Sequence, residues 1–231
     1  DLRSSRIISV ESLVRWQHPQ RGFLSPDVFI PLAEQTGLIN QLTFWVLKNA
    51  LQQCAVFDQA GVEITVAVNL SARSLNDIRI PGEIAHMLGI AKIKPAMLVI
   101  EITESAVMSN PDEALNALQI LDRMGVSLAI DDFGTGYSSL AYLSKLPVDE
   151  IKIDKSFVLD MVLDEQAAVI VRSTIDLGHN LGKKVVAEGV ETLELWNLLS
   201  EWGCDTAQGY YMSKPLSADQ LMQWLKDSRW A

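Results

Sequence analysis

The sequence is poor in the residues that mark disulfide-rich, zinc-binding and nucleic-acid-binding proteins. Two cysteines, Cys54 and Cys204, and three histidines are scattered over 231 residues without CxxC spacing. This pattern is typical of buried free thiols in a reducing compartment. Lysine and arginine number 19 against 29 aspartates and glutamates, which gives a net charge of −10. That charge argues against non-specific binding to a DNA or RNA polymer, which requires a basic surface.

Long apolar runs and several common catalytic motifs are absent as well. No stretch approaches the roughly 20 apolar residues of a membrane span, and the first residues lack a signal-peptide pattern. We therefore expect a cytoplasmic domain, although a full-length protein that contains it could be attached to a membrane. The sequence contains no P-loop, dinucleotide-binding, H-E-x-x-H or G-x-S-x-G motif.

Short β-rich runs alternate with helical patterns along the chain. The predicted strands are 6–16, 63–71, 97–103, 126–132, 150–154, 184–189 and 205–211. The clearest helical patterns are 25–37, 38–61, 110–125, 164–182 and 217–227. This alternation predicts an α/β protein with a largely parallel sheet covered by helices. No low-complexity linker interrupts it, so we expect residues 1–231 to form a single domain.

Polar side chains recur at or near the carboxyl ends of the predicted strands. Read with a period of two, six strands each place one on the face opposite their larger apolar residues: Glu11, Asn69, Glu101, Asp131, Lys152 and Glu188. An open doubly wound sheet would concentrate its site at one switch point, whereas a β/α barrel gathers all strand ends in a ring. The pattern therefore favours a barrel. Any one of these residues could simply be solvated at the rim, but six together predict a site for hard cations such as Mg²⁺ or Mn²⁺.

The stretch VSLAIDDFGTGYSSL places two carboxylates, Asp131 and Asp132, directly after an apolar strand. Inside a regular strand these two side chains would face opposite ways. One interpretation is a capped strand end followed by a turn. The other is that the backbone turns at the strand end, so that both carboxylates reach bound cations.

Seven ordered motifs carry a family resemblance: ESLVRW, NLS, EITES, DDFGTGYSSL, KIDKSFV, AEGVET and QGYYMSKP. In this order they resemble the EAL-domain cyclic di-GMP phosphodiesterases, from about residue 7 to residue 225. The resemblance implies a TIM-like (β/α) barrel that hydrolyses cyclic di-GMP to linear pGpG with two Mg²⁺ or Mn²⁺ ions. Metal ions would also explain how an acidic protein holds an anionic dinucleotide.

The resemblance also implies roles for the acidic residues and the lysine. Glu11, Asn69, Glu101 and Asp131 look like ligands of one metal, and Asp131 would bridge to a second metal held with Asp132 and Glu188. Lys152 looks like the residue that orients or deprotonates the attacking water. Lys152, Glu188 and Glu11 are therefore the predicted catalytic residues.

Other motif positions resemble substrate-binding and supporting residues of the family. The implied substrate contacts are Leu13, Arg15, Asp154 and Gln208, with Arg15 on a phosphate and Asp154 on a guanine. Glu104 resembles the glutamate that anchors the loop DFGTGYSSL, and Glu191 a supporting acid behind the metal ligands. The face formed by DFGTGYSSLAYLSKL and KIDKSFV resembles the family's dimer face, which predicts a homodimer.

Three departures from the family pattern stand out. Ser12 replaces the usual alanine of the signature, and Met212 stands where an aromatic residue is common. The family's first strand, with its YQP element, is not visible in this sequence, so barrel closure is open. The domain is expected to come from a larger signalling protein with a sensory or GGDEF-type regulatory domain.

Two other functions remain open at this point. A catalytically silent EAL domain that acts as a cyclic di-GMP receptor typically loses metal ligands or the lysine, and here none is lost. A metal-dependent barrel enzyme acting on a small carbonyl substrate fits only if the motifs are ignored.

Overall fold

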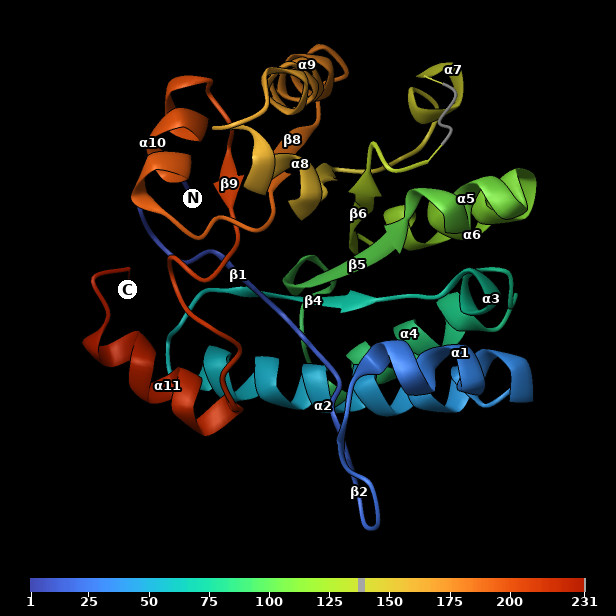
Figure 1. The fold of residues 1–231 in the computed structure, drawn as a ribbon. Helices are drawn as coiled ribbons and strands as arrows, with labels where there is room; N and C mark the ends of the chain where they lie inside the picture. The colour runs from blue at the N-terminus through green and yellow to red at the C-terminus, as the bar shows by residue number, and fades with distance from the viewer. Residues whose placement is uncertain (137–139, 231) are drawn as a thin grey trace.

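A computed structural model describes residues 1–136 and 140–230. Its centre is a parallel seven-stranded sheet in the order β1-β4-β5-β6-β7-β8-β9. The strands are β1 (Ser9–Glu11), β4 (Thr65–Asn69), β5 (Leu98–Thr103), β6 (Ser127–Phe133), β7 (Glu150–Ile153), β8 (Lys184–Ala187) and β9 (Thr206–Ala207). The sheet curls into a half-barrel with helices around it (Figure 1), which confirms the expected TIM-like α/β architecture.

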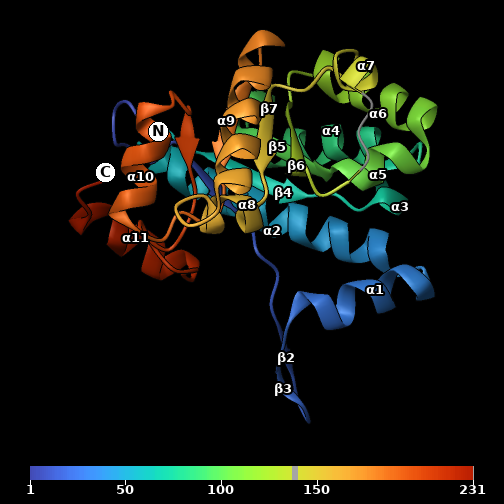
Figure 2. The ribbon, with the colours of Figure 1, turned by 45° about the horizontal axis from the view of Figure 1, so that its top comes forward.

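Helices surround the sheet (Figures 1 and 2). They are α1 (Pro26–Thr36), α2 (Ile39–Gln59), α3 (Ala72–Leu75), α4 (Ile80–Ala91), α5 (Glu104–Ser109), α6 (Pro111–Arg123), α7 (Leu140–Leu143), α8 (Lys155–Asp160), α9 (Glu165–Asn180), α10 (Leu193–Glu201) and α11 (Ala218–Asp227). A short 3₁₀ helix, η1 (Pro95–Met97), precedes β5. Apolar residues of α2, α4 and α6 pack on β4–β7, and those of α9 and α10 pack on β7–β9.

The period-two assignment of strand faces is confirmed for the central strands β4, β5 and β6 up to Ile130. Ile100 and Ile102 of β5 belong to the outer core under the helices. The alternate residue Val99 joins Ala67 and Ala129 in a separate small cluster inside the curl. These inner side chains are small. They leave room inside the curl for the polar side chains that follow on the same face, at the carboxyl ends of the strands.

The predicted strand 6–16 is wrong in its second half. Parallel pairing with β4 stops at Glu11, and the chain then forms an antiparallel hairpin of β2 (Trp16–His18) and β3 (Gly22–Leu24) that projects from the body (Figure 2). Similarly, the predicted strand 205–211 shrinks to the two residues of β9. The helices α4 and α10, which were not among the clearest sequence patterns, complete the outer layer.

β1 and β9 are the two outermost strands of the sheet, and the described residues show no strand pairing between them. Other contacts cross this seam. The N–H of Leu2 donates to Asp205 O (2.9 Å), and the N–H of Ile7 donates to Trp230 O (2.8 Å). The two outermost strands are therefore held near each other by the chain ends rather than by a continuous ladder.

Candidate active site

Lys152 of β7 is the centre of an acidic cluster at the carboxyl ends of the strands. Its side chain is only 2% exposed, and its Nζ lies 2.6 Å from Glu188 Oε1, 2.9 Å from Glu101 Oε1 and 3.2 Å from Asp131 Oδ1. Glu11 Oε2 is 4.0 Å away. Each carboxylate comes from a different strand or strand end, so only the curl of the sheet brings them together.

Glu11 is held by two side-chain amides. Asn69 Nδ2 at the end of β4 donates to Glu11 Oε1 (2.6 Å), and Gln208 Nε2 after β9 donates to Glu11 Oε2 (2.7 Å). The second bond joins the two outermost strands of the sheet across the seam. These contacts place Asn69 and Gln208 beside the acidic cluster, while the metal-binding role of Asn69 and the substrate-binding role of Gln208 stay predictions.

A β-bulge explains the aspartate doublet. Ile130 of β6 pairs with Ile151 of β7, and the next paired residue of β6 is Phe133, opposite Ile153. Two residues of β6 therefore lie opposite the single Lys152. The strand continues through Phe133, so the doublet lies within the strand and not at its end as expected from the sequence.

The extra residue of the bulge is Asp132, whose φ of 54° is left-handed. This turn of the backbone breaks the alternation of side chains. Carboxylate oxygens of Asp131, Asp132 and Glu188 consequently lie within 4.8 Å of one another. The N–H of Asp132 donates to Asp131 Oδ1 (3.0 Å).

The turn that follows β6 is fastened to α5. Glu104, which is buried, accepts a hydrogen bond at Oε2 from the N–H of Gly134 (3.1 Å). A Cβ on Gly136 would lie 2.8 Å from Glu104 Oε1, so the turn packs directly on this carboxylate. Thr135, which the sequence reasoning passed over, donates its hydroxyl to Asp132 O (2.9 Å). The remainder of the motif, residues 137–139, lies outside the described residues.

The cluster holds more negative charge than its single ammonium can balance. Burial alone would lower the pKa of Lys152, but its carboxylate neighbours raise that pKa well above the usual value. Burial raises the pKa of Glu101 to about 8 and that of Glu188 to about 7, although Lys152 opposes both shifts. Burial and the charge of Asp131 likewise raise the pKa of Asp132. The site therefore favours the binding of further positive charge.

The sequence profile of the EAL domain matches residues 1–215. The chain belongs to the EAL domain family. It is 42% identical over 217 residues to the bifunctional diguanylate cyclase/cyclic di-GMP phosphodiesterase MucR of Pseudomonas aeruginosa, which covers 94% of this chain and 32% of MucR. It is 43% identical over 229 residues to the cyclic di-GMP phosphodiesterase NbdA of the same organism, covering 99% of this chain and 29% of NbdA.

A solved structure supports the same family. The PaMucR phosphodiesterase in complex with c-di-GMP superimposes with a TM-score of 0.90 at 43% identity, covering 93% of this chain and 87% of that chain. The EAL domain described here spans about a third of the length of the curated relatives it matches.

The residues of this EAL domain fit a divalent metal. Every candidate ligand is an oxygen donor, which suits Mg²⁺ or Mn²⁺. Glu101 Oε2 is buried with no hydrogen-bond partner among the described residues, which is costly unless a cation or another donor meets it. Together with the carboxylates of Asp131, Asp132 and Glu188, this oxygen makes the acidic cluster able to bind a metal ion.

Three predicted residues of the EAL domain lie outside the acidic cluster, and a fourth, Asp154, lies next to Asp132 and also caps a helix. Leu13 and Arg15 do not continue the face of Glu11, because β1 ends there. Arg15 is exposed and donates from Nη1 to Val14 O (2.9 Å). Glu191 is exposed, and Asp154 caps α8 by accepting from the N–H of Ser156 (3.0 Å). Their roles toward substrate or metal stay predictions.

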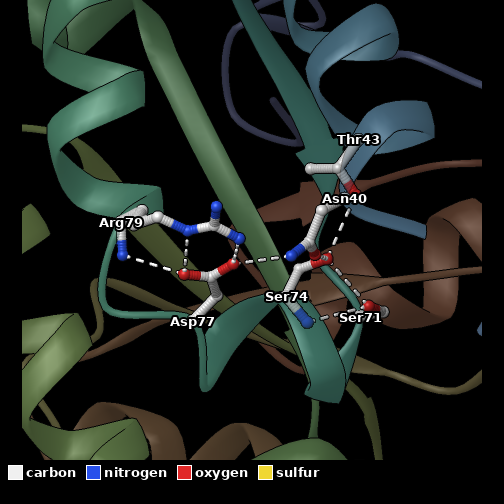
Figure 3. A network of polar contacts seen from close by, with 6 residues as sticks. All are labelled: Asn40, Thr43, Ser71, Ser74, Asp77 and Arg79. Carbon is white, nitrogen blue, oxygen red and sulfur yellow. Dashed lines mark hydrogen bonds and ion pairs between the residues drawn. The ribbon is translucent and has the colours of Figure 1, made fainter. Parts of the chain in front are cut away.

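A polar network on the outside of the EAL barrel was not predicted. Asp77 accepts from Arg79 Nε (2.9 Å) and from Asn40 Nδ2 (2.7 Å), and Ser74 Oγ donates to Asn40 Oδ1 (2.8 Å; Figure 3). Thr43 Oγ1 lies 3.2 Å from Ser74 Oγ. The network fastens α2 to the segment after β4 and borders a cavity of about 580 Å³ that contains no residue of the acidic cluster.

Within residues 1–136 and 140–230, none of the helices combines the length and apolar character needed to cross a bilayer.

Proposed function

We propose that this EAL domain hydrolyses cyclic di-GMP to linear pGpG. The observation that carries the proposal is the intact cluster in which Lys152 meets the carboxylates of Glu11, Glu101, Asp131 and Glu188. A charge-neutralising site of this kind suits phosphodiester hydrolysis, in which negative charge develops on the phosphate oxygens. Relatives named cyclic di-GMP phosphodiesterases and a solved relative in complex with c-di-GMP support this substrate.

Two Mg²⁺ or Mn²⁺ ions are proposed as cofactors. Asp131 would be shared between them. The other proposed ligands are Glu11, Asn69 and Glu101 for the first ion and Asp132 and Glu188 for the second. Bound metal would supply an activated water and neutralise charge on the phosphate.

The chain's own residues would prepare the attack. Lys152 holds its proton firmly, because the surrounding carboxylates raise its pKa. In this state it donates hydrogen bonds, so we assign it the orientation of the attacking water or a phosphate oxygen rather than proton abstraction. Glu188 would act in catalysis through the second metal ion, to which it would contribute a carboxylate ligand. Gln208 and Asn69 would keep Glu11 oriented.

Substrate contacts and assembly complete the proposal. Leu13, Arg15, Asp154 and Gln208 would contact the dinucleotide, with Glu104 and Glu191 supporting the site.

We propose a cytoplasmic homodimer within a larger signalling protein that carries a sensory or GGDEF-type regulatory domain. The greater length of the relatives supports the last point. Leu140 of α7, an exposed apolar residue within the predicted dimer face, supports a protein contact there.

The test is to incubate the purified chain with cyclic di-GMP and Mg²⁺ and to separate the products by chromatography. Formation of pGpG is expected, and it should stop in Lys152→Met and with a chelator. Ligand that binds but stays intact would instead support a cyclic di-GMP receptor. Failure to bind cyclic di-GMP at all would overturn both functions and favour a different substrate.

A further inference from the structure

Thr135 makes two hydrogen bonds to the residue that forms the β-bulge. Its hydroxyl donates to Asp132 O (2.9 Å), and its backbone N–H donates to the same oxygen (3.3 Å). We propose that Thr135 is a positioning residue that holds Asp132 in its left-handed conformation, so that both carboxylates of the doublet face the metal site. The inference rests on the proposed function in so far as this doublet binds metal.

The conformation of Asp132 needs such support. A left-handed backbone is unfavourable for a residue with a Cβ, although less so for aspartate than for most residues, and the hydrogen bonds around Asp132 help to retain its φ of 54°. Without the bulge, Asp132 would follow the alternation of β6 and face the helices. Its carboxylate would then leave the group of oxygens that lie within 4.8 Å of one another with Asp131 and Glu188.

Within the bulge the N–H of Asp132 donates to Asp131 Oδ1, and other contacts hold the turn rather than the Asp132 carbonyl. Glu104 accepts from the N–H of Gly134, two residues beyond Asp132. A Cβ on Gly134 would lie 3.0 Å from the ring of Phe157, so that ring covers the turn from the other side. Neither of these two contacts involves the Asp132 carbonyl, which accepts its hydrogen bonds from Thr135. Among residues 1–136 and 140–230, the hydroxyl of Thr135 is the side-chain group that hydrogen-bonds to the carbonyl of Asp132.

The deciding variants are Thr135→Val, which removes the hydroxyl at nearly constant shape, and Thr135→Ser, which retains it. Thr36→Val is the matched control, because Thr36 Oγ1 also donates to a backbone carbonyl (Leu32 O, 2.7 Å) but lies in α1. Mn²⁺ binding is measured by titration calorimetry, and the backbone at position 132 by crystallography. A Thr135→Ala variant replaces Thr135→Val if the latter does not fold.

We expect Thr135→Val to bind Mn²⁺ roughly tenfold more weakly, the equivalent of about 1.4 kcal/mol, while Thr135→Ser and Thr36→Val keep wild-type affinity. Hydrolysis by Thr135→Val should recover at saturating Mn²⁺, because the ligands themselves are intact.

Wild-type Mn²⁺ affinity in Thr135→Val, or a crystal structure of it with an unchanged positive φ at Asp132, overturns the proposal. A wild-type chain that binds no Mn²⁺ overturns it as well. If wild type binds Mn²⁺ but does not cleave cyclic di-GMP, the proposed function fails while the Mn²⁺ titrations still decide the role of Thr135.

Discussion

At the scale of single residues, Asp131 and Asp132 have different surroundings although they are neighbours in sequence. Asp131 Oδ1 lies 3.2 Å from the ammonium of Lys152 and accepts the N–H of Asp132. Asp132 is half-buried on the bulge, and its nearest charges are other carboxylates. Removing one charge should therefore have different consequences at the two positions.

Asp131→Asn should weaken both metals and lower turnover by roughly 10³-fold or more, because a shared ligand and a partner of Lys152 are lost together. Asp132→Asn should keep the fold, since asparagine tolerates a left-handed backbone. It should also keep the first metal and substrate binding, yet lose most of the rate. Metal titration by calorimetry and pGpG production on both variants test this pair. If both bind as many metal ions as wild type, or Asp132→Asn turns over normally, the paired-metal explanation is wrong.

Asp77, which lies away from the active site, should make the stability of the fold depend on pH. Hydrogen bonds from Arg79 lower the pKa of Asp77 to about 2. A carboxyl whose pKa is lowered in the folded state stabilises the fold above its unfolded value, near 3.8, and this contribution is lost as the pH falls through 2. Asp77→Asn should reduce the free energy of unfolding by about 1 kcal/mol at pH 6, a small value because the pair is close to solvent.

The measurement is urea unfolding of wild type and Asp77→Asn at steps from pH 6 to pH 2. The difference between the two should shrink as the pH approaches 2. Glu63→Gln, at an exposed position, is the control for loss of a surface carboxylate. A difference that stays constant down to pH 2 would show that Asp77 acts through packing and not through its charge.

At the scale of elements, the active site depends on how the turn after β6 is joined to α5. Glu104 begins α5 immediately after β5. Its carboxylate accepts the N–H of Gly134 at the end of the neighbouring strand β6. A single buried side chain thus couples the ends of two strands that carry proposed ligands, Glu101 and Asp131.

Glu104→Ala should lower metal affinity and turnover by roughly 10–100-fold without removing a proposed ligand. Glu104→Gln retains an acceptor oxygen for the N–H of Gly134 and should lose less. Calorimetric metal titration and steady-state kinetics on the two variants compare the loss of the hydrogen bond with the loss of charge alone. Wild-type behaviour of Glu104→Ala would remove the anchoring role.

At the scale of the whole molecule, the curl of the sheet determines which strand ends meet. Glu11 and Gln208 are 197 positions apart, yet they share a hydrogen bond across the seam between β1 and β9. The acidic cluster is therefore a property of the complete sheet. The proposed dimer would also affect the active site, because the predicted contact face includes the segment directly after the aspartate doublet.

Leu140→Asp should shift the proposed dimer toward monomer and lower turnover. Leu140 is 56% exposed in the isolated chain, so a charge there should leave the fold intact while opposing burial in an interface. Ile90→Asp, at a position on α4 that is 70% exposed, is the matched control. Light scattering coupled to size-exclusion chromatography gives the mass of each variant. A strictly monomeric wild type with full activity at high concentration would contradict the dimer.

Much of the active site followed from strand patterns, and the failures have local physical causes. Glu101, Asp131 and Lys152 were predicted on one face because alternation along a strand is a property of each strand alone. The same reasoning failed for Leu13 and Arg15. There the pairing with β4 ends after Glu11, and apolar and polar residues continue to alternate through a segment that is no longer a strand.

The sequence by itself determined the α/β architecture, the faces of the regular strands such as β5 and the family, because these depend on periodicity and on motifs within short segments. Only the tertiary structure decided how the aspartate doublet is used. The bulge arises from the pairing of β6 with β7. The register of this pairing depends on both strands, so it cannot be predicted from the sequence of either strand alone. The same holds for the bond between Glu11 and Gln208, since contact between the first and last strands exists only once the whole sheet has curled.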